Sequence, residues 1–152
     1  MRWDAVGEAL LMVAARRCHL LATIWPALNQ GRWVVSDRFA DSTLAYQGSA
    51  GGVPRADLEA LHRLIAEDFA PDLTLILDLP VELGLARAQA RRGAETRFER
   101  KPRAFHEKLR QGFLDIATRE PQRCAVIDAA LDADAVHQAV LAALRERLQV
   151  QV

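Results

Sequence analysis

The sequence is poor in the residue types that mark several classes of protein. It contains only two cysteines, Cys18 and Cys124, without a Cys-x-x-Cys or paired-histidine spacing. This usage favours reduced thiols over a disulfide framework or a zinc site. The longest uncharged stretch, residues 18–31, is too short and too polar to cross a bilayer, and the acidic residues near the start are not typical of a signal peptide. We therefore expect a cytoplasmic protein without a membrane segment.

Net charge is also absent, because 20 basic and 20 acidic side chains cancel. A neutral chain has no overall attraction to nucleic acid or to an anionic membrane, so neither is an expected partner. Lysine occurs only at Lys101 and Lys108, and every other basic residue is arginine. Residues 87–110 hold nine basic and three acidic residues, a local net charge of +6. This segment either binds phosphate or consists of solvated helix faces.

The remaining composition is that of a globular protein. Of the 152 residues, 51% are hydrophobic and 26% are charged, which excludes a disordered tail and a collagen-like repeat. The length suits one compact domain, and we predict a single domain over residues 1–152.

Short apolar runs alternate with segments of helical periodicity. Buried strands are predicted at residues 33–36, 73–77 and 124–127, and each is followed by an aspartate: Asp37, Asp78 and Asp128. Residues 37–52 are expected to be irregular. Helices are predicted at 4–29, 54–69, 80–92, 105–116 and 132–149. The alternation predicts an α/β fold with a parallel sheet covered on both faces, in which ligands bind beyond the carboxyl ends of the strands.

The most informative motif follows the first predicted strand. It reads Asp-Arg-Phe from residue 37 and Asp-Ser-Thr-Leu-Ala-Tyr-Gln-Gly from residue 41. A strand that ends in Asp37 resembles a Walker-B element, whose carboxylate helps to hold Mg²⁺. Arg38 offers a planar fork for a phosphate group. Taken alone, this pair is equally typical of a helix cap or a turn.

The whole string resembles the Asp-Arg motif of thymidylate kinases, in which Asp-Arg-(Phe/Tyr/His) is followed by Ser and then by Ala-Tyr-Gln-Gly. Further ordered similarities cover residues 8–16, 71–78, 91–99 and 126–129. The resemblance implies a three-layer α/β fold of the P-loop nucleoside-monophosphate-kinase type with a parallel sheet. It also implies a lid over residues 93–103.

The family implies transfer of a phosphoryl group from ATP to thymidine 5′-monophosphate (dTMP), with Mg²⁺, giving dTDP for nucleotide biosynthesis. By this resemblance, Asp37 holds Mg²⁺, directly or through water, and Arg38 grips the 5′-phosphate of dTMP. Arg16 is implied to hydrogen-bond the thymine edge. The other substrate-binding residues that the resemblance implies are Met12, Ser42, Thr43, Tyr46 and Gln47.

Met12 and Arg16 are four residues apart in the first predicted helix, so they share one face. Met12 stands where the family usually has an aromatic residue that stacks on thymine, and a polarizable thioether can lie against a ring. The alternative is that Met12 belongs to the core and that Arg16 is a surface charge.

The lid is expected to supply positive charge near the transferring phosphoryl group. Arg92 and Arg97 are the candidate catalytic residues of the lid, ahead of Arg91 and Arg87. A solvated basic loop is the alternative.

The sequence contains no Gly-rich turn followed by Lys and Ser/Thr, which cradles the donor phosphates in P-loop kinases. We therefore expect the chain to start inside the family's fold, without its N-terminal strands, and to be inactive alone. Two hypotheses stay open: a kinase whose acceptor site and lid are encoded here, or a non-catalytic fragment that binds nucleotide. A generic nucleoside-monophosphate kinase is a third. The family also implies a homodimer through the long first helix.

Overall fold

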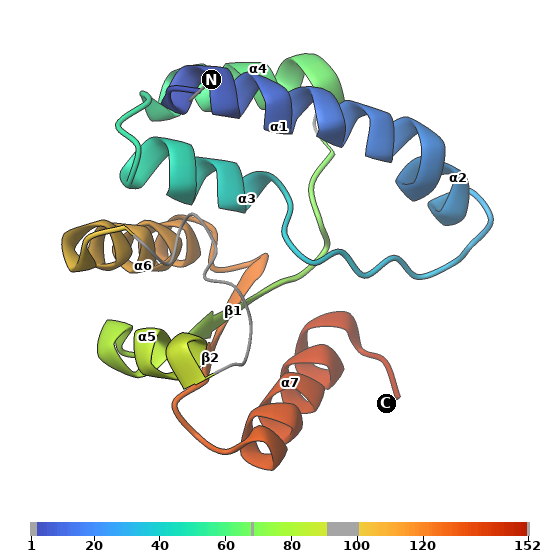
Figure 1. Ribbon diagram of the computed structural model, residues 1–152. Coiled ribbons are helices and arrows are strands. Elements are labelled where there is room, and N and C mark those ends of the chain that lie inside the picture. Colours follow the sequence, from blue (N-terminus) through green and yellow to red (C-terminus); the bar gives the residue numbers. More distant parts are fainter. Residues whose placement is uncertain (1–2, 68, 91–100, 152) are drawn as a thin grey trace. The chain divides into compact units, whose positions relative to one another are not determined.

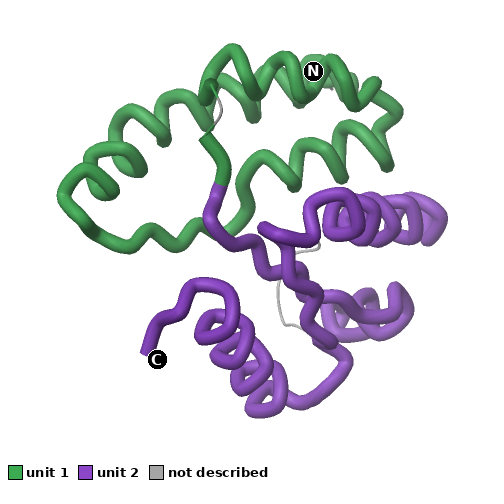
Figure 2. Tube along the Cα trace, turned by 180° about the vertical axis from the view of Figure 1, so that it is seen from behind, with its two compact units in different colours: residues 1–70 green, residues 71–152 purple. Residues whose placement is uncertain are grey.

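A computed structural model of the protein describes residues 3–67, 69–90 and 101–151. The chain divides into two compact units, residues 1–70 and 71–152, which are coloured separately in Figure 2. Each unit is described by itself below. The single domain over residues 1–152 stays a prediction.

The first unit begins with the long helix that the sequence predicts. It consists of α1 (Ala5–His19), a π-helical turn at Leu20–Ile24 and α2 (Trp25–Leu28). The helix starts where Asp4 caps it, because the Asp4 carboxylate accepts a hydrogen bond of 2.7 Å from the backbone N–H of Gly7. It ends before Gly31, whose positive φ of 69° suits a residue without a Cβ. The predicted helix over residues 4–29 is therefore confirmed.

The prediction of a buried strand at residues 33–36 is wrong. The segment has no strand structure, and the side chains of Trp33 and Val35 are 69% and 97% exposed. Val34 alternates with them and packs against the buried cluster of Leu20, Ile24 and Ala66. A strand needs a neighbour that hydrogen-bonds its backbone, and none of the described residues pairs with this segment. Apolar alternation alone therefore does not form a strand here.

Residues 40–49 are helical, which corrects the expectation of an irregular segment over 37–52. The helix comprises α3 (Ala40–Thr43) and a π-helical turn at Leu44–Ser49. The position of Gly48 in this helical segment has a packing reason. A Cβ there would lie 3.1 Å from the Cδ1 atom of Leu58, so glycine lets the next helix approach closely.

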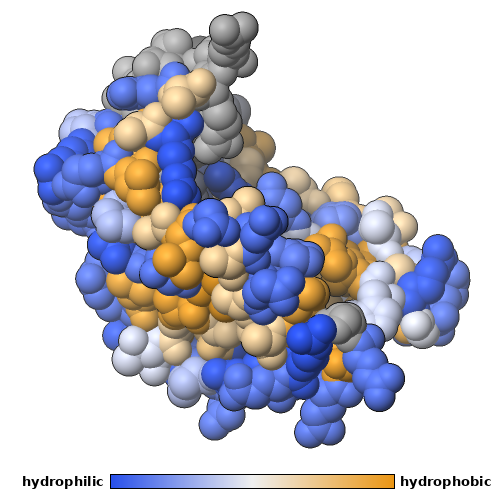
Figure 3. Space-filling model, turned by 90° about the horizontal axis from the view of Figure 1, so that it is seen from below, coloured by the Kyte–Doolittle hydropathy of each residue, from blue (hydrophilic) through white to orange (hydrophobic). Residues whose placement is uncertain are grey.

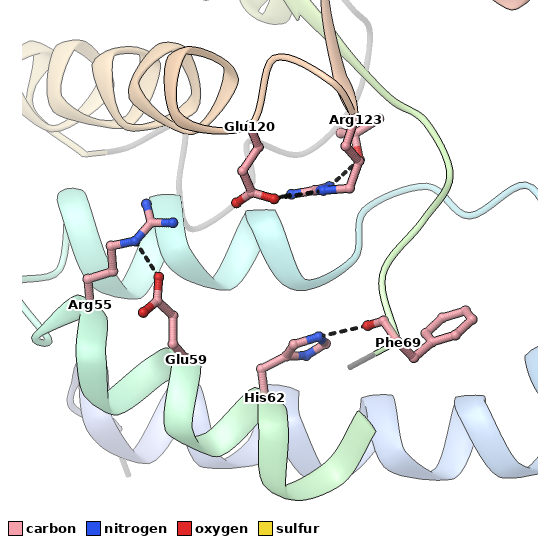
Figure 4. Close-up of polar contacts among 7 residues, drawn as sticks. Arg55, Glu59, His62, Phe69, Glu120 and Arg123 are labelled. Carbon is pink, nitrogen blue, oxygen red and sulfur yellow. Dashed lines mark hydrogen bonds and ion pairs between the residues drawn. The ribbon is translucent and has the colours of Figure 1, made fainter. Parts of the chain in front are cut away.

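That next helix, α4 (Arg55–Ala66), starts after Pro54 as predicted and ends three residues before the expected Phe69. The Nε2 atom of His62 donates to the Phe69 carbonyl at 3.1 Å and ties the following loop back to the helix (Figure 4). Figure 1 shows α1 and α4 side by side, and the two helices contact each other. The core of the unit lies between the π-helical turn at Leu20–Ile24 and the end of α4, around Leu20, Ile24 and Ala66.

The second unit contains the parallel sheet. In the described residues this sheet has two strands, β1 (Thr74–Asp78) and β2 (Cys124–Asp128), in register from Thr74 beside Cys124 to Asp78 beside Asp128. The helices of the unit are α5 (Val81–Ala90), α6 (Arg103–Arg119) and α7 (Ala133–Leu148). Parallel pairing with helical crossovers confirms the predicted α/β class.

Helices cover both faces of the two strands. Ala125 and Ile127 of β2 pack against α7 through Ala143, while α6 contacts both strands. Figure 1 shows α6 and α7 on opposite sides of the strands. Arg123 fixes the start of the sheet, because its guanidinium donates to the Glu120 carboxylate, drawn in Figure 4, and at 2.7 Å to the Thr74 hydroxyl.

Some apolar side chains remain at the surface. Figure 3 shows apolar groups exposed between hydrophilic ones on one face, and Leu77, Val126 and Leu131 of the second unit are each about half exposed. Among the described helices, none is both long enough and apolar enough to cross a membrane. Most of the predicted lid at 93–103 lies outside the described residues.

Candidate functional site

Arg16 joins two helices of the first unit. Its Nη2 atom donates a hydrogen bond of 2.6 Å to the hydroxyl of Thr43 and one of 3.2 Å to the carbonyl of Phe39. The guanidinium carbon also lies 5.3 Å from the centroid of the Phe39 ring. Arg16 and Thr43 are 27 positions apart in the sequence, and the fold brings these two predicted site residues into direct contact.

The environment of Arg16 is partly buried and acidic. Burial lowers the pKa of Arg16 below its ordinary value, and the negative charge of Asp41 opposes this shift. Asp41 itself is only 6% exposed. An arginine keeps its proton in proteins, so Arg16 offers a fixed positive charge and only hydrogen-bond donors to a ligand.

Arg38 is the second cation of the site, and its backbone is unusual. Its φ is 71°, in the left-handed region that a non-glycine residue rarely adopts. The hydroxyl of Ser36 donates to the carbonyl of Arg38 at 2.9 Å and supports this conformation. The exposed guanidinium lies 4.9 Å from the ring centroid of Tyr46, another predicted site residue. Backbone strain of this kind is concentrated at functional sites.

The alternative interpretation of Met12 and Arg16 does not fit the structure. Met12 is 50% exposed, so it is not a core residue, and Arg16 is half-buried rather than a free surface charge. Both side chains lie on α1, one turn apart. An exposed thioether beside a held guanidinium can contact a planar ring.

Gln47 lies deeper than the other predicted residues. It is 5% exposed, and its amide donates at 3.3 Å to the carboxylate of Glu8 on α1. Ser42 is half-buried, and its backbone N–H donates to the carbonyl of Phe39 at 3.2 Å. The hydrogen bond between Gln47 and Glu8 connects the turn at Leu44–Ser49 to α1.

Asp37 is exposed and precedes Arg38 directly. Within the described part of the chain, its side chain makes no hydrogen bond to the other predicted site residues, and no group of three or more His, Cys, Asp or Glu forms a metal cage. Mg²⁺ does not need such a cage, because it usually keeps several waters and binds one or two carboxylates together with substrate phosphates. A single exposed carboxylate beside an exposed arginine is compatible with this chemistry.

Arg92 and Arg97, the predicted catalytic residues of the lid, lie outside the described residues, as does Arg91. Arg87 is described and has a structural partner. Its guanidinium donates to the carbonyls of Ala129, Ala130 and Leu131 after β2, at 2.6 to 3.4 Å.

The carboxyl ends of the strands carry the predicted Asp78 and Asp128. Arg110 binds the carboxylate of Asp78 through two hydrogen bonds of 2.7 and 2.8 Å. These bonds lower the pKa of Asp78, although burial opposes the shift. Asp128 accepts from the backbone N–H of Ala130 at 2.9 Å.

Sequence reasoning missed Arg110 as the partner of Asp78 and the burial of Asp41. The basic segment at 87–110 contained a signal for Arg110, but nothing in the spacing distinguished an internal ion pair from a phosphate ligand. Arg103 in the same segment is also paired, with Glu82 and Glu107. Part of the local positive charge therefore stabilises the second unit.

Comparison with known proteins extends the similarity over almost the whole chain. The family model for thymidylate kinase matches residues 2–140. The thymidylate kinase of Nitrobacter hamburgensis is 54% identical over 148 residues, which cover 96% of this chain and 64% of that protein. The thymidylate kinase of Caulobacter vibrioides is 54% identical over 147 residues, covering 97% of this chain and 70% of that protein.

A crystal structure of thymidylate kinase from Ehrlichia chaffeensis is similar in fold, with a TM-score of 0.73 and 34% identity. The match covers 94% of this chain and 66% of that one. The chain thus spans about two thirds of the length of these relatives. On the family match, the identity and the shared fold together, this chain belongs to the thymidylate kinase family.

Proposed function

We propose that this chain carries the dTMP-binding acceptor site of an ATP-dependent thymidylate kinase. The reaction moves a phosphoryl group from ATP to a phosphate oxygen of dTMP and leaves ADP and dTDP. The observation that carries the proposal is the hydrogen bond of 2.6 Å between Arg16 and Thr43. It joins two residues on separate helices, of which the family resemblance assigns Arg16 to the thymine edge and Thr43 to contact with the base.

In this proposal, residues of the first unit bind different parts of dTMP. Arg38 binds the 5′-phosphate, because its guanidinium is exposed and can form paired hydrogen bonds with phosphate oxygens. Arg16 donates to the thymine edge, and Met12 lies against the ring one helical turn away. Tyr46 packs near the sugar beside Arg38. Ser42 and Thr43 contact the base, and Gln47 contributes indirectly by connecting to α1.

The remaining assignments concern the donor side of the reaction. Asp37 would hold Mg²⁺, directly or through water, and the ion would neutralise charge on the phosphates. Arg92 and Arg97 would supply positive charge from the lid. We further propose that a kinase with this acceptor site acts in the cytoplasm as a homodimer and uses ATP and dTMP as substrates.

Binding of dTMP tests the acceptor site directly. We expect isothermal titration calorimetry to detect dTMP binding, and Arg38→Ala to weaken it by about ten- to a hundredfold, since hydrogen bonds to a charged group are lost. Arg63→Ala is the matched control, because it removes an exposed arginine of the same unit outside the site. Equal binding by wild type and Arg38→Ala would remove Arg38 from its role, and no dTMP binding at all would refute the proposal.

A second experiment addresses catalysis. The given residues contain no Gly-rich turn followed by Lys and Ser/Thr, so we propose that they bind dTMP but do not transfer phosphate by themselves. A coupled assay for ADP formation with ATP, Mg²⁺ and dTMP is expected to show no turnover. Robust turnover by the purified chain would contradict this part of the proposal and leave the acceptor site intact.

A further inference from the structure

Residues 36–38 form a short bend between two fixed points of the first unit. On one side, Val34 packs against the buried cluster that contains Leu20. On the other side, the carbonyl of Phe39 accepts a hydrogen bond of 3.2 Å from the Arg16 guanidinium. Residues 36–38 are themselves exposed, so burial does not determine their conformation. The conformation of the bend therefore depends on its own local contacts.

The bend contains an uncommon backbone conformation at Arg38. Its φ of 71° lies in the left-handed region, which is less stable than the helical and extended regions for a residue with a Cβ. The hydroxyl of Ser36 donates a hydrogen bond of 2.9 Å to the carbonyl of this same residue. One neutral hydrogen bond and the strain of one left-handed residue are comparable in size. The contact from Ser36 can therefore decide whether the conformation persists.

The backbone conformation of Arg38 also affects the direction of its side chain. In the observed conformation, the guanidinium lies 4.9 Å from the centroid of the Tyr46 ring. A change to a negative φ would turn the Cα–Cβ bond relative to the preceding peptide. It would thereby change the direction from which the guanidinium meets a ligand. Ser36 acts on this direction without any contact to the guanidinium itself.

We propose that Ser36 is a positioning residue for phosphate binding: its hydroxyl holds the left-handed backbone of Arg38, so that the guanidinium presents its paired N–H donors to the 5′-phosphate of dTMP. This inference rests on the proposed dTMP site. A bidentate contact needs aligned donors, and a side chain that is already oriented loses less freedom on binding. Thymidine has no phosphate for Arg38 to bind, so its affinity does not depend on Ser36.

The first test compares a nucleotide with its nucleoside. NMR titration, which also measures weak binding, gives the affinities of wild type and Ser36→Ala for dTMP and for thymidine. We expect the ratio of dTMP to thymidine affinity to fall by about threefold in Ser36→Ala, because one neutral and exposed hydrogen bond is lost. Ser49→Ala is the matched control, since Ser49 is an exposed serine of the same unit. An unchanged ratio overturns the proposal.

The backbone of Arg38 provides a second readout that needs no nucleotide. At a positive φ of this size, the amide hydrogen and the α-hydrogen of one residue lie close together, so the nuclear Overhauser effect between them is strong. We expect a strong effect at Arg38 in wild type and a weaker one in Ser36→Ala. Equal effects in both proteins overturn the proposal even where the affinity ratio falls, because Ser36 would then act on the phosphate directly.

The same pair of readouts separates this inference from the proposed function. If wild type fails to bind dTMP while the backbone of Arg38 still depends on Ser36, the proposed function fails and the effect of Ser36 on the backbone survives. If wild type binds dTMP and neither readout responds to Ser36→Ala, the positioning role fails and the acceptor site survives.

Two further variants test how Ser36 acts. Ser36→Thr keeps the hydroxyl, so we expect it to restore both the affinity ratio and the backbone signal of Arg38. In the Arg38→Ala background, Ser36→Ala is expected to cause no further loss of dTMP affinity, because Ser36 acts only through Arg38. Circular dichroism establishes that each variant is folded. A further loss in that background, or a folded Ser36→Thr that behaves like Ser36→Ala, overturns the proposal.

Discussion

The ion pair between Asp78 and Arg110 stabilises the second unit in a way that depends on pH. Arg110 on α6 donates two hydrogen bonds to the carboxylate at the end of β1. The side chains of Asp78 and Arg110 are 20% and 40% exposed, so the pair is neither fully buried nor fully solvated. Asp78→Asn keeps the shape of the side chain and removes its charge.

The size of the effect follows from this intermediate exposure. Exposed ion pairs contribute about 0–1 kcal/mol, and hydrogen bonds to charged groups contribute about 1.5–3 kcal/mol. We therefore expect Asp78→Asn to lower the free energy of unfolding by about 1–2 kcal/mol at neutral pH. Urea unfolding followed by circular dichroism measures this difference.

The pH dependence has a defined sign. The hydrogen bonds from Arg110 hold the pKa of Asp78 below its ordinary value, although burial opposes the shift. A depressed carboxyl pKa stabilises the folded state above the unfolded value of about 3.9, and this stabilisation is lost as the pH falls through the folded pKa. The difference between wild type and Asp78→Asn is therefore expected to be constant from about pH 5 to 8 and to shrink below about pH 4.

Two comparisons decide whether this reasoning holds. Asp72→Asn is the control, because Asp72 is exposed just before β1. In a double-mutant cycle, Asp78→Asn and Arg110→Gln are expected to show a coupling energy of about 1 kcal/mol. Additive effects of the two substitutions, or a difference that does not change in acid, would refute the role of the pair.

Two further predictions concern stability. Leu20→Ala removes a fully buried side chain from the core of the first unit and is expected to cost about 2–5 kcal/mol in urea unfolding, whereas Leu21→Ala, at a half-exposed position, should cost much less. Asp132 caps α7 by accepting from the backbone N–H of Ala135 at 2.9 Å, so Asp132→Ala is expected to lower the free energy of unfolding by about 1 kcal/mol. Equal costs at Leu20 and Leu21, or a neutral Asp132→Ala, would contradict the assigned packing and capping.

Local signals in the sequence predicted much of the fold. The helices that begin at Asp4 and Asp132 and the strands that end in Asp78 and Asp128 lie where the sequence predicts them, because each depends on neighbouring residues. The segment at 33–36 has the apolar pattern of a strand, but a strand also requires a distant pairing partner. Pattern alone does not supply one.

The candidate site, like the fold, was predicted only where the signal lies in neighbouring residues. The resemblance assigns Arg16 and Thr43 to the base, and the fold brings these two side chains into contact, as it does Arg38 and Tyr46. It did not indicate that Arg16 bonds the carbonyl of Phe39, or that several arginines of the basic segment hold the second unit together. These contacts join residues far apart in the sequence, where spacing carries no information.

The most direct test of the acceptor site is to locate where dTMP binds. In a titration of ¹⁵N-labelled protein with dTMP, we predict that the largest amide shifts fall in α1 near Arg16 and in residues 37–47, with a smaller response in β1 and β2. Thymidine, which lacks the phosphate, should perturb residues near Arg16 and leave Arg38 largely unchanged. Shifts confined to the second unit, or identical responses to dTMP and thymidine at Arg38, would contradict the account.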